Sequence, residues 1–176
     1  MSILKVARMG NPVLRTRARA LDRAEIKTPA IQKLIDDMID TMEEYNGIGL
    51  AAPQVHEGLR IFIAGLEASG NDEDEPTVVP VPFINPEISP VGAEQVMDWE
   101  GCLSIPDIRG QVSRHRQVRV RALDRDGARV ELELSDFAAR VVQHENDHLE
   151  GVLFFDRMRS FETLTFMDEF SKFWCD

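Results

Sequence analysis

The segment between residues 136 and 151 limits the fold more than any other part of the chain. Over residues 137–149, apolar side chains return every three or four positions, which is the spacing of a helix with one buried face. Ser135 or Asp136 can cap the start of this helix, and Gly151 can end it. Few charges stand at its start, so we expect it to be surrounded by protein. Its stripe runs through Phe137, Val141, His144 and His148.

Two histidines on this stripe predict a metal site. His144 and His148 are four residues apart, so their imidazoles project from one face of the helix, about one turn apart. Such a pair can bind one transition-metal ion, with Glu145 close to anything else bound there. Burying two imidazoles without partners is unfavourable, whereas metal ligation and a hydrogen bond satisfy both ring nitrogens. Histidines without metal on an ordinary helix are the alternative.

A cysteine outside the helix is the candidate third ligand. Cys102 lies 42 positions before His144 and is one of only two cysteines in the chain. Taken alone, such a cysteine is most often a small buried side chain. Gly101, directly before it, gives the backbone freedom and leaves the thiol an uncrowded approach. Three protein ligands would leave one tetrahedral position open, which is typical of a catalytic metal site.

The remaining helices and the clearest hairpin follow from periodicity. Residues 29–45 have the pattern of an amphipathic helix, with Thr28 as its N-cap. Residues 160–174 predict a short final helix. In residues 118–123 and 130–134, strand-forming side chains flank a turn sequence, and in the second segment apolar residues alternate with glutamates. This hairpin should therefore have one buried face and one wet face.

Two other segments have strand character, with an acidic loop between them. Residues 60–64 predict a strand, and residues 67–77 predict the loop. Residues 78–84 also resemble a strand. Pro80 and Pro82 cannot donate a backbone hydrogen bond, so we expect this segment at a sheet edge or in an irregular extended conformation.

Length and composition restrict the class of protein. The 176 residues suit one domain with a substantial core. The net charge of −11 should repel nucleic acid and anionic membranes, so we expect neither as a direct partner. The chain has no apolar run of about 18 residues, and its start does not resemble a secretory signal. Two cysteines give no disulfide framework, so we expect a cytoplasmic protein.

Three motifs together resemble those of the peptide deformylase family and occur in the family's order. They are Gly47-Ile48-Gly49-Leu50-Ala51-Ala52-Pro53-Gln54, Glu100-Gly101-Cys102-Leu103-Ser104 and Gln143-His144-Glu145-Asn146-Asp147-His148. The similarity extends from the early amphipathic helix to about Phe155 and is weak beyond it. With the predicted elements, it leads us to expect a single α+β domain over residues 1–176. In this domain, antiparallel strands would surround the central helix that carries both histidines.

The resemblance implies a metal-dependent hydrolase that removes the N-formyl group from the initiator methionine of new polypeptides and releases formate. Cys102, His144 and His148 would hold one divalent cation, with water as the fourth ligand. The family typically uses iron(II), also works with nickel or cobalt, and is often isolated with zinc. Two imidazoles and a thiolate are compatible with all four metals. The cation would lower the pKa of water, so that hydroxide is available to attack the formyl carbon.

The same resemblance implies roles for the residues around the metal. Glu145 would accept the water proton and deliver it to the leaving amine. The Gln54 side-chain amide and the Leu103 backbone N–H would donate hydrogen bonds to the oxygen that becomes negative. The substrate-binding residues, for which ordinary core or turn positions are the alternative, would be Gly47, Ile48, Gly49, Gly101, Arg109 and Val141.

Two features depart from the family's pattern. Arg140 stands where the family more often has an apolar residue, and its stem could still cover the methionine slot. Residues 161–176 contain one cation and four acids, whereas some bacterial deformylases end in a basic helix that docks on the ribosome. We therefore expect N-formylmethionyl nascent peptides as partners, and any ribosome contact should not use a basic C-terminal helix.

Three rival hypotheses stay open at this point. A zincin-like protease shares the helix motif but takes its third ligand from a later His or Glu, and no histidine follows His148. A structural zinc site in a binding module needs a fourth protein ligand, for which Cys175, His56 and His115 are available. A deformylase-like protein without activity has no support in the three motifs, because every residue needed is present.

Overall fold

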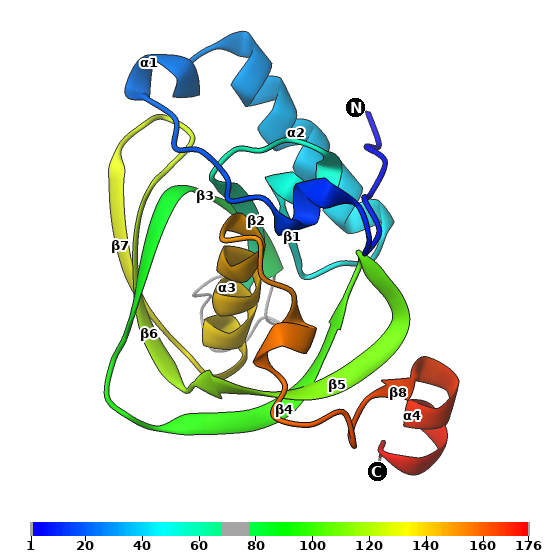
Figure 1. Cartoon of the computed structure of the whole chain (residues 1–176). Helices are drawn as coiled ribbons and strands as arrows, with labels where there is room; N and C mark the ends of the chain where they lie inside the picture. Colours follow the sequence, from blue (N-terminus) through cyan, green and yellow to red (C-terminus); the bar gives the residue numbers. More distant parts are fainter. Residues whose placement is uncertain (1, 68–77, 176) are drawn as a thin grey trace, which may run out of the picture.

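Antiparallel strands enclose one central helix in a single α+β domain, as the computed structural model of residues 2–67 and 78–175 shows (Figure 1). The larger sheet has the strand order β1-β2-β3-β6-β7, and the smaller has the order β4-β5-β8. The strands are β1 (Gly49–Ala51), β2 (Ile61–Glu67), β3 (Val78–Pro90), β4 (Gln95–Cys102), β5 (Ile105–His115), β6 (Gln117–Leu123), β7 (Arg129–Ser135) and β8 (Thr165–Phe166). The α-helices are α1 (Arg23–Ile26), α2 (Pro29–Glu44), α3 (Asp136–Leu149) and α4 (Met167–Phe173), and short 3₁₀ helices occupy Pro12–Arg15, Ala52–Val55 and Phe154–Arg157.

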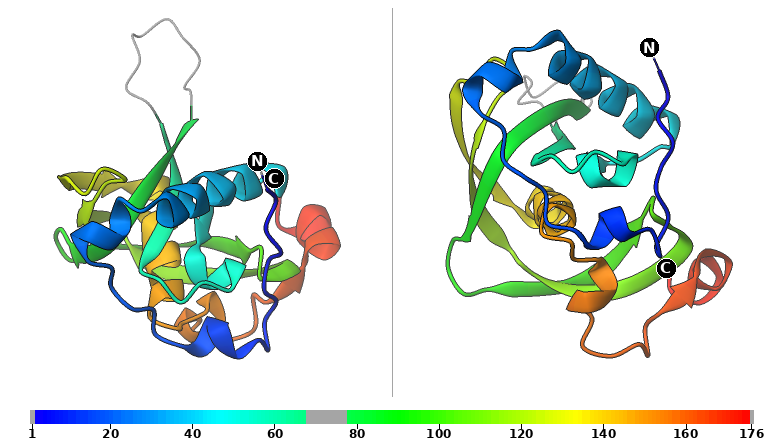
Figure 2. Two further views of the ribbon diagram at one scale, coloured as in Figure 1. Left: turned by 90° about the horizontal axis from the view of Figure 1, so that it is seen from above. Right: turned by 45° about the horizontal axis from the view of Figure 1, so that its top comes forward.

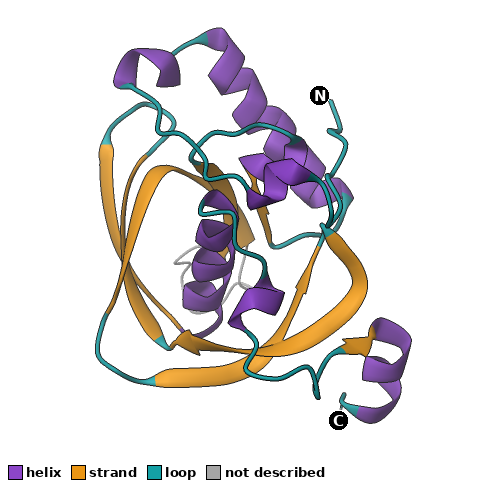
Figure 3. Cartoon of the chain, viewed as in Figure 1, coloured by secondary structure: helices purple, strands orange, loops and turns teal. Residues whose placement is uncertain are grey.

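Helix α3 lies inside the strands, as Figure 3 shows, and so confirms the prediction of a central helix. Its Ala139, Val142 and Leu149 are buried in one apolar cluster with Phe62 and Phe83 of the larger sheet. Burial of such side chains is the main favourable contribution to folding, so this cluster fixes where the helix lies. The helix ends as expected, because Gly151 adopts a left-handed conformation with φ of 73°.

Helix α2 forms where the sequence predicts it and packs on the outer side of the larger sheet (Figure 2). Ile35 and Met38 on its inner face are buried in a second cluster with Ile61 and Ile63 of β2. Thr28 occupies the N-cap position, but its hydroxyl donates to the carbonyl of the preceding α1 helix instead of capping α2. The loop after α2 leads directly into β1.

The prediction of a sheet-edge position for residues 78–84 is confirmed for most of this segment, although β3 as a whole lies in the middle of the larger sheet. Pro80 and Pro82 pair with β2, and pairing with β6 begins only at Ile84. This half of β3 therefore has a paired neighbour on one side only, which explains how the sheet accommodates two prolines. The strand then continues to Pro90 through a register shift.

The predicted hairpin is confirmed as β6 and β7, whereas the longer hairpin of β4 and β5 was not predicted. Gln95–Trp99 in β4 are mostly exposed, so the strand lacks the alternation of buried and exposed side chains that reveals a sheet. Cys102 stands at the end of this strand, and Ile105 begins β5 opposite it. The unpredicted hairpin therefore positions the candidate thiol ligand.

Two other expectations concern the loop and the C-terminus. Glu67 belongs to β2, and the rest of the predicted acidic loop, residues 68–77, lies outside the described residues. The predicted helix over residues 160–174 is too long, because α4 begins at Met167 after the two-residue strand β8. Among the described helices, none is long and apolar enough to cross a membrane.

Candidate metal centre

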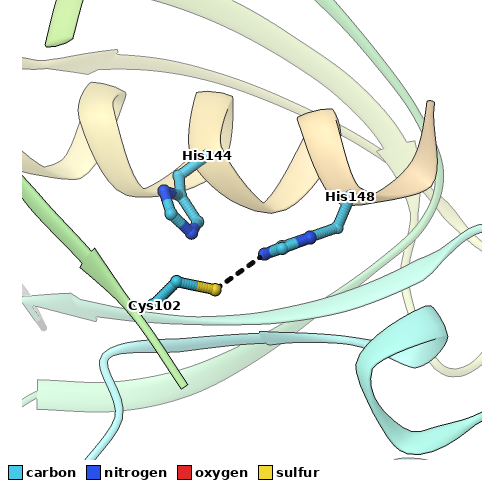
Figure 4. A group of neighbouring side chains, drawn as sticks. All are labelled: Cys102, His144 and His148. Atoms are coloured by element: carbon cyan, nitrogen blue, oxygen red, sulfur yellow. Dashed lines mark hydrogen bonds between the residues drawn. The ribbon is translucent and has the colours of Figure 1, made fainter. Parts of the chain in front are cut away.

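Cys102, His144 and His148 converge at one point between β4 and α3 (Figure 4). The Cys102 Sγ lies 3.3 Å from the His148 Nε2, and one ligand atom from each residue lies within 4.8 Å of the other two. A thiol and two imidazoles are the donor types that bind zinc, iron, nickel or cobalt. No other group of three such side chains was found in residues 2–67 and 78–175, and no fourth protein ligand joins this one. The three residues therefore form a metal site with room for a non-protein ligand.

A buried carboxylate holds the first imidazole in place. The Glu100 Oε2 lies 2.9 Å from the His144 Nδ1, so the other ring nitrogen is left to face the metal position. The Arg114 guanidinium donates to both oxygens of the same carboxylate, at 2.8 and 2.9 Å. Burial by itself would raise the pKa of Glu100, but Arg114 and His144 hold it well below its ordinary value. Glu100 therefore stays ionised and fixes the orientation of the imidazole.

The thiol is in an environment that favours its ionised form. Burial would raise the pKa of Cys102, but the neighbouring His148 and His144 lower it well below the ordinary value of a cysteine. A thiolate, not a thiol, is the form of cysteine that ligates metal ions. The local electrostatics therefore match a ligand role for Cys102.

Glu145 lies beside the metal position with its side chain buried. Only 5% of the residue is exposed, and its Oε2 has no hydrogen-bond partner in the described structure. Burial is the main reason that the pKa of Glu145 rises to about 7. A carboxyl group with such a pKa can accept and return a proton near neutral pH.

The structure gives a reason for a glycine at position 49 that the sequence does not reveal. A Cβ at this position would overlap the Glu145 carboxylate. The absence of a side chain on β1 therefore makes room for the carboxylate next to the metal ligands. We expected this glycine to admit the substrate backbone, and the structure adds a separate requirement for it.

Gln54 is held beside the thiol by two fixed contacts. Its Oε1 accepts a hydrogen bond from the Ala51 backbone N–H at 2.8 Å. Its Nε2 donates to the Ser104 hydroxyl at 3.2 Å and lies 3.5 Å from the Cys102 Sγ. Because the Oε1 contact fixes the amide, its nitrogen points toward the metal position. Leu103 lies in the turn that directly follows Cys102 and borders the same cleft.

An open cleft of about 670 Å³ brings these groups together with the expected substrate-binding residues. Ile48 is 46% exposed, so it is a wall of the cleft and not ordinary core, whereas Val141 is almost fully buried at its floor. A Cβ on Gly101 would stand 2.6 Å from the Arg109 Nη1, so the glycine allows this guanidinium to lie over β4. The expected residues that border the cleft are Gly47, Ile48, Gly49, Gly101, Arg109 and Val141.

The role of Arg140 goes beyond covering the cleft with the apolar part of its side chain. Its guanidinium is buried and donates to the Val96 carbonyl at 2.7 Å, the Val112 carbonyl at 2.8 Å and the Glu100 carboxylate at 2.9 Å. It therefore ties α3 to both strands of the β4–β5 hairpin. Sequence reasoning missed this network and the role of Arg114 in it. The residues that pair come from α3, β4 and β5, and no local spacing in the sequence connects them.

Replacing Arg140 with methionine is expected to lower the free energy of unfolding by about 2 kcal/mol, since one buried and one partly buried carbonyl lose their donor while Arg114 still compensates Glu100. The matched control is Arg116→Met, which breaks only exposed ion pairs and should change stability by less than about 1 kcal/mol. Unfolding of the metal-saturated proteins in guanidinium chloride measures both changes in the free energy of unfolding. Equal losses in the two variants would contradict the assigned role.

Comparisons with known proteins agree with this geometry. The family model described as polypeptide deformylase matches residues 3–163. The chain is 44% identical to peptide deformylase 2 of Nostoc sp. over 90% of this chain and 87% of that protein. It is 41% identical to peptide deformylase 1 of Nitrosomonas europaea over 94% of this chain and 93% of that protein.

Solved structures give the same result. A class I type b peptide deformylase from Acinetobacter baumannii with bound Met-Ala-Ser is similar with a TM-score of 0.81 and 39% identity, over 90% of this chain and 100% of that chain. The peptide deformylase from Thermotoga maritima is similar with a TM-score of 0.79 and 39% identity, over 91% and 100% of the two chains.

Proposed function

This chain belongs to the peptide deformylase family, and we propose that it removes the formyl group from the initiator methionine of newly made polypeptides and releases formate. One observation carries the proposal: the metal ligands Cys102, His144 and His148 converge beside an open cleft that also contains a buried carboxylate. The ligand set leaves a coordination position for water, as catalytic metal sites do. We assign iron(II) as the ion in the cell, with zinc, nickel or cobalt as substitutes in isolated protein.

The residues around the metal have separate roles in the reaction. A cation held by Cys102, His144 and His148 would supply Lewis acidity for the activation of water and the polarisation of the formyl group. Glu145 takes the proton from the attacking water and passes it to the methionine nitrogen as the carbon–nitrogen bond breaks, so that formate and a free amine leave. The Gln54 amide and the Leu103 N–H stabilise the negative charge on the formyl oxygen, for which one donor is typically worth about 3–4 kcal/mol.

The substrate is held by the walls of the cleft. The peptide Met-Ala-Ser is bound in the similar structure from Acinetobacter baumannii, and we assign the same class of ligand to this chain. Ile48 and Val141 would contact the methionine side chain. The glycines Gly47, Gly49 and Gly101 would let the peptide backbone approach, and Arg109 would contact the substrate at the rim.

The setting of this reaction is the cytoplasm, where new polypeptides carry the formyl group. We propose that any contact with the ribosome does not use a basic C-terminal helix, because residues 161–176 contain one cation and four acids. We do not propose nucleic acids or membranes as direct partners, because the net charge of −11 should repel nucleic acid and anionic membranes.

A formate-release assay tests the proposed function. Protein purified without oxygen and loaded with iron(II) should release one formate and one free amine from each formyl-Met-Ala-Ser, and it should leave acetyl-Met-Ala-Ser intact. An unblocked peptide serves as a further control, because a zincin-like protease would cut its internal bonds. Internal cleavage without formate release would refute the proposal.

A further inference from the structure

We propose that Trp99 and Met167 form an apolar extension of the cleft, which selects apolar side chains in the substrate after its initiator methionine. This inference rests on the proposed deformylase function and adds a preference for the second or third residue of the nascent chain. The two side chains come from β4 and from the first position of α4, and both border the cleft that contains the metal ligands.

The position of Trp99 links this surface to the expected substrate path. Trp99 lies two residues before Gly101 on β4, and both residues border the cleft. The Arg109 guanidinium lies over Gly101 and borders the same cleft. A peptide with its formyl group at the metal and its chain leaving past Arg109 therefore meets Trp99 next.

The C-terminal segment is fixed against this surface by several contacts. Strand β8 pairs with β5, where Thr165 lies opposite Arg109. The rings of Phe170 and Trp174 pack edge-on against Trp99, with centroid distances of 4.8 and 5.2 Å. Met167 is consequently held beside the mouth of the cleft, at the outer side of the smaller sheet where Figure 2 shows α4.

The exposure of the same segment shows that the chain does not cover it. In α4, all of which the structure describes, no residue is buried. Met167 is 39% exposed and Phe166 is 63% exposed. Contiguous apolar surface of this kind usually marks a binding site. Because Met167 continues the wall of the catalytic cleft, the occupant that fits is the peptide already bound there.

One of the two side chains lies outside the family match. The polypeptide deformylase model covers Trp99 but ends at residue 163, before β8 and α4 begin. The part of the extension that Met167 contributes is therefore a feature of this chain beyond the region that the family model matches.

The test compares formyl-Met-Ala-Leu and formyl-Met-Leu-Ser with formyl-Met-Ala-Ser in the iron(II)-loaded protein. We expect kcat/KM for at least one leucine peptide to exceed that for the serine peptide by about fivefold, the effect of partly burying one leucine side chain. In Met167→Ala this ratio should fall to about two or less. The matched control is Phe173→Ala, on the same helix but outside the cleft, which should keep the ratio of the unchanged protein.

The outcomes separate this inference from the proposed function. Turnover of all three peptides with ratios near one would overturn the extension and leave the deformylase function intact. A fivefold ratio that persists in both Met167→Ala and Met167→Glu would also overturn it. Absence of formate release from every peptide would instead refute the proposed function, and the inference with it. The ratio of kcat/KM between two peptides is compared because a general loss of structure would lower the rates for all peptides together and leave this ratio unchanged.

Discussion

Replacing Glu145 with glutamine is expected to keep the metal and to lower kcat for formate release by about 10³-fold. The amide has nearly the same shape as the carboxylate but cannot accept the proton of the attacking water, and general acid–base catalysis typically contributes about 10²–10⁴-fold. The side chain is buried beside the metal ligands but is not one of them. Metal content by elemental analysis and single-turnover formate release would separate the two effects.

The control for this experiment is Glu162→Gln, which removes an exposed carboxylate and should leave both metal content and kcat unchanged. A Glu145→Gln protein that kept its turnover would contradict the assigned proton transfer. Loss of metal and of the folded structure together would make Glu145 a structural residue.

Replacing Cys102 with alanine is expected to abolish stable metal binding and, with it, formate release. The substitution removes one of the three protein ligands. Losing only a hydrogen-bond partner of a metal ligand typically lowers metal affinity by roughly 10–100-fold, so losing the ligand itself should lower it further. Competition with a chelator of known affinity measures the change. The fold should persist, because the thiol lies at the end of β4 and only partly contributes to the core.

Cys175→Ala is the matched control, since it removes the other cysteine of the chain, which is exposed. This variant should bind metal and release formate like the unchanged protein. If it lost its metal while Cys102→Ala kept it, the site would be a structural zinc site that uses the C-terminal thiol.

The central helix could be predicted from the sequence because its information is local. Apolar spacing over α3 and the two histidines four residues apart define both the element and the face that it buries. Helix α2 was predictable for the same reason. The convergence of Cys102 on this face could be expected only from the order of the three motifs, since no local pattern connects β4 with α3.

Other parts of the site depend on contacts between distant segments. The pairing of Glu100 with Arg114 and Arg140 has no periodic signal, although it fixes the orientation of His144. The clearance that Gly49 provides for Glu145 likewise becomes visible only when β1 and α3 lie side by side. The β4–β5 hairpin was missed because exposed residues fill the first half of its first strand.

Anomalous X-ray diffraction at the metal edge, from crystals of protein purified without oxygen, tests the central claim most directly. We predict one ion at about 2.3 Å from the Cys102 Sγ and at about 2.1 Å from one nitrogen of each of His144 and His148, with a further position open to the cleft. An ion bound elsewhere, or bound by the two histidines without the sulfur, would contradict the account.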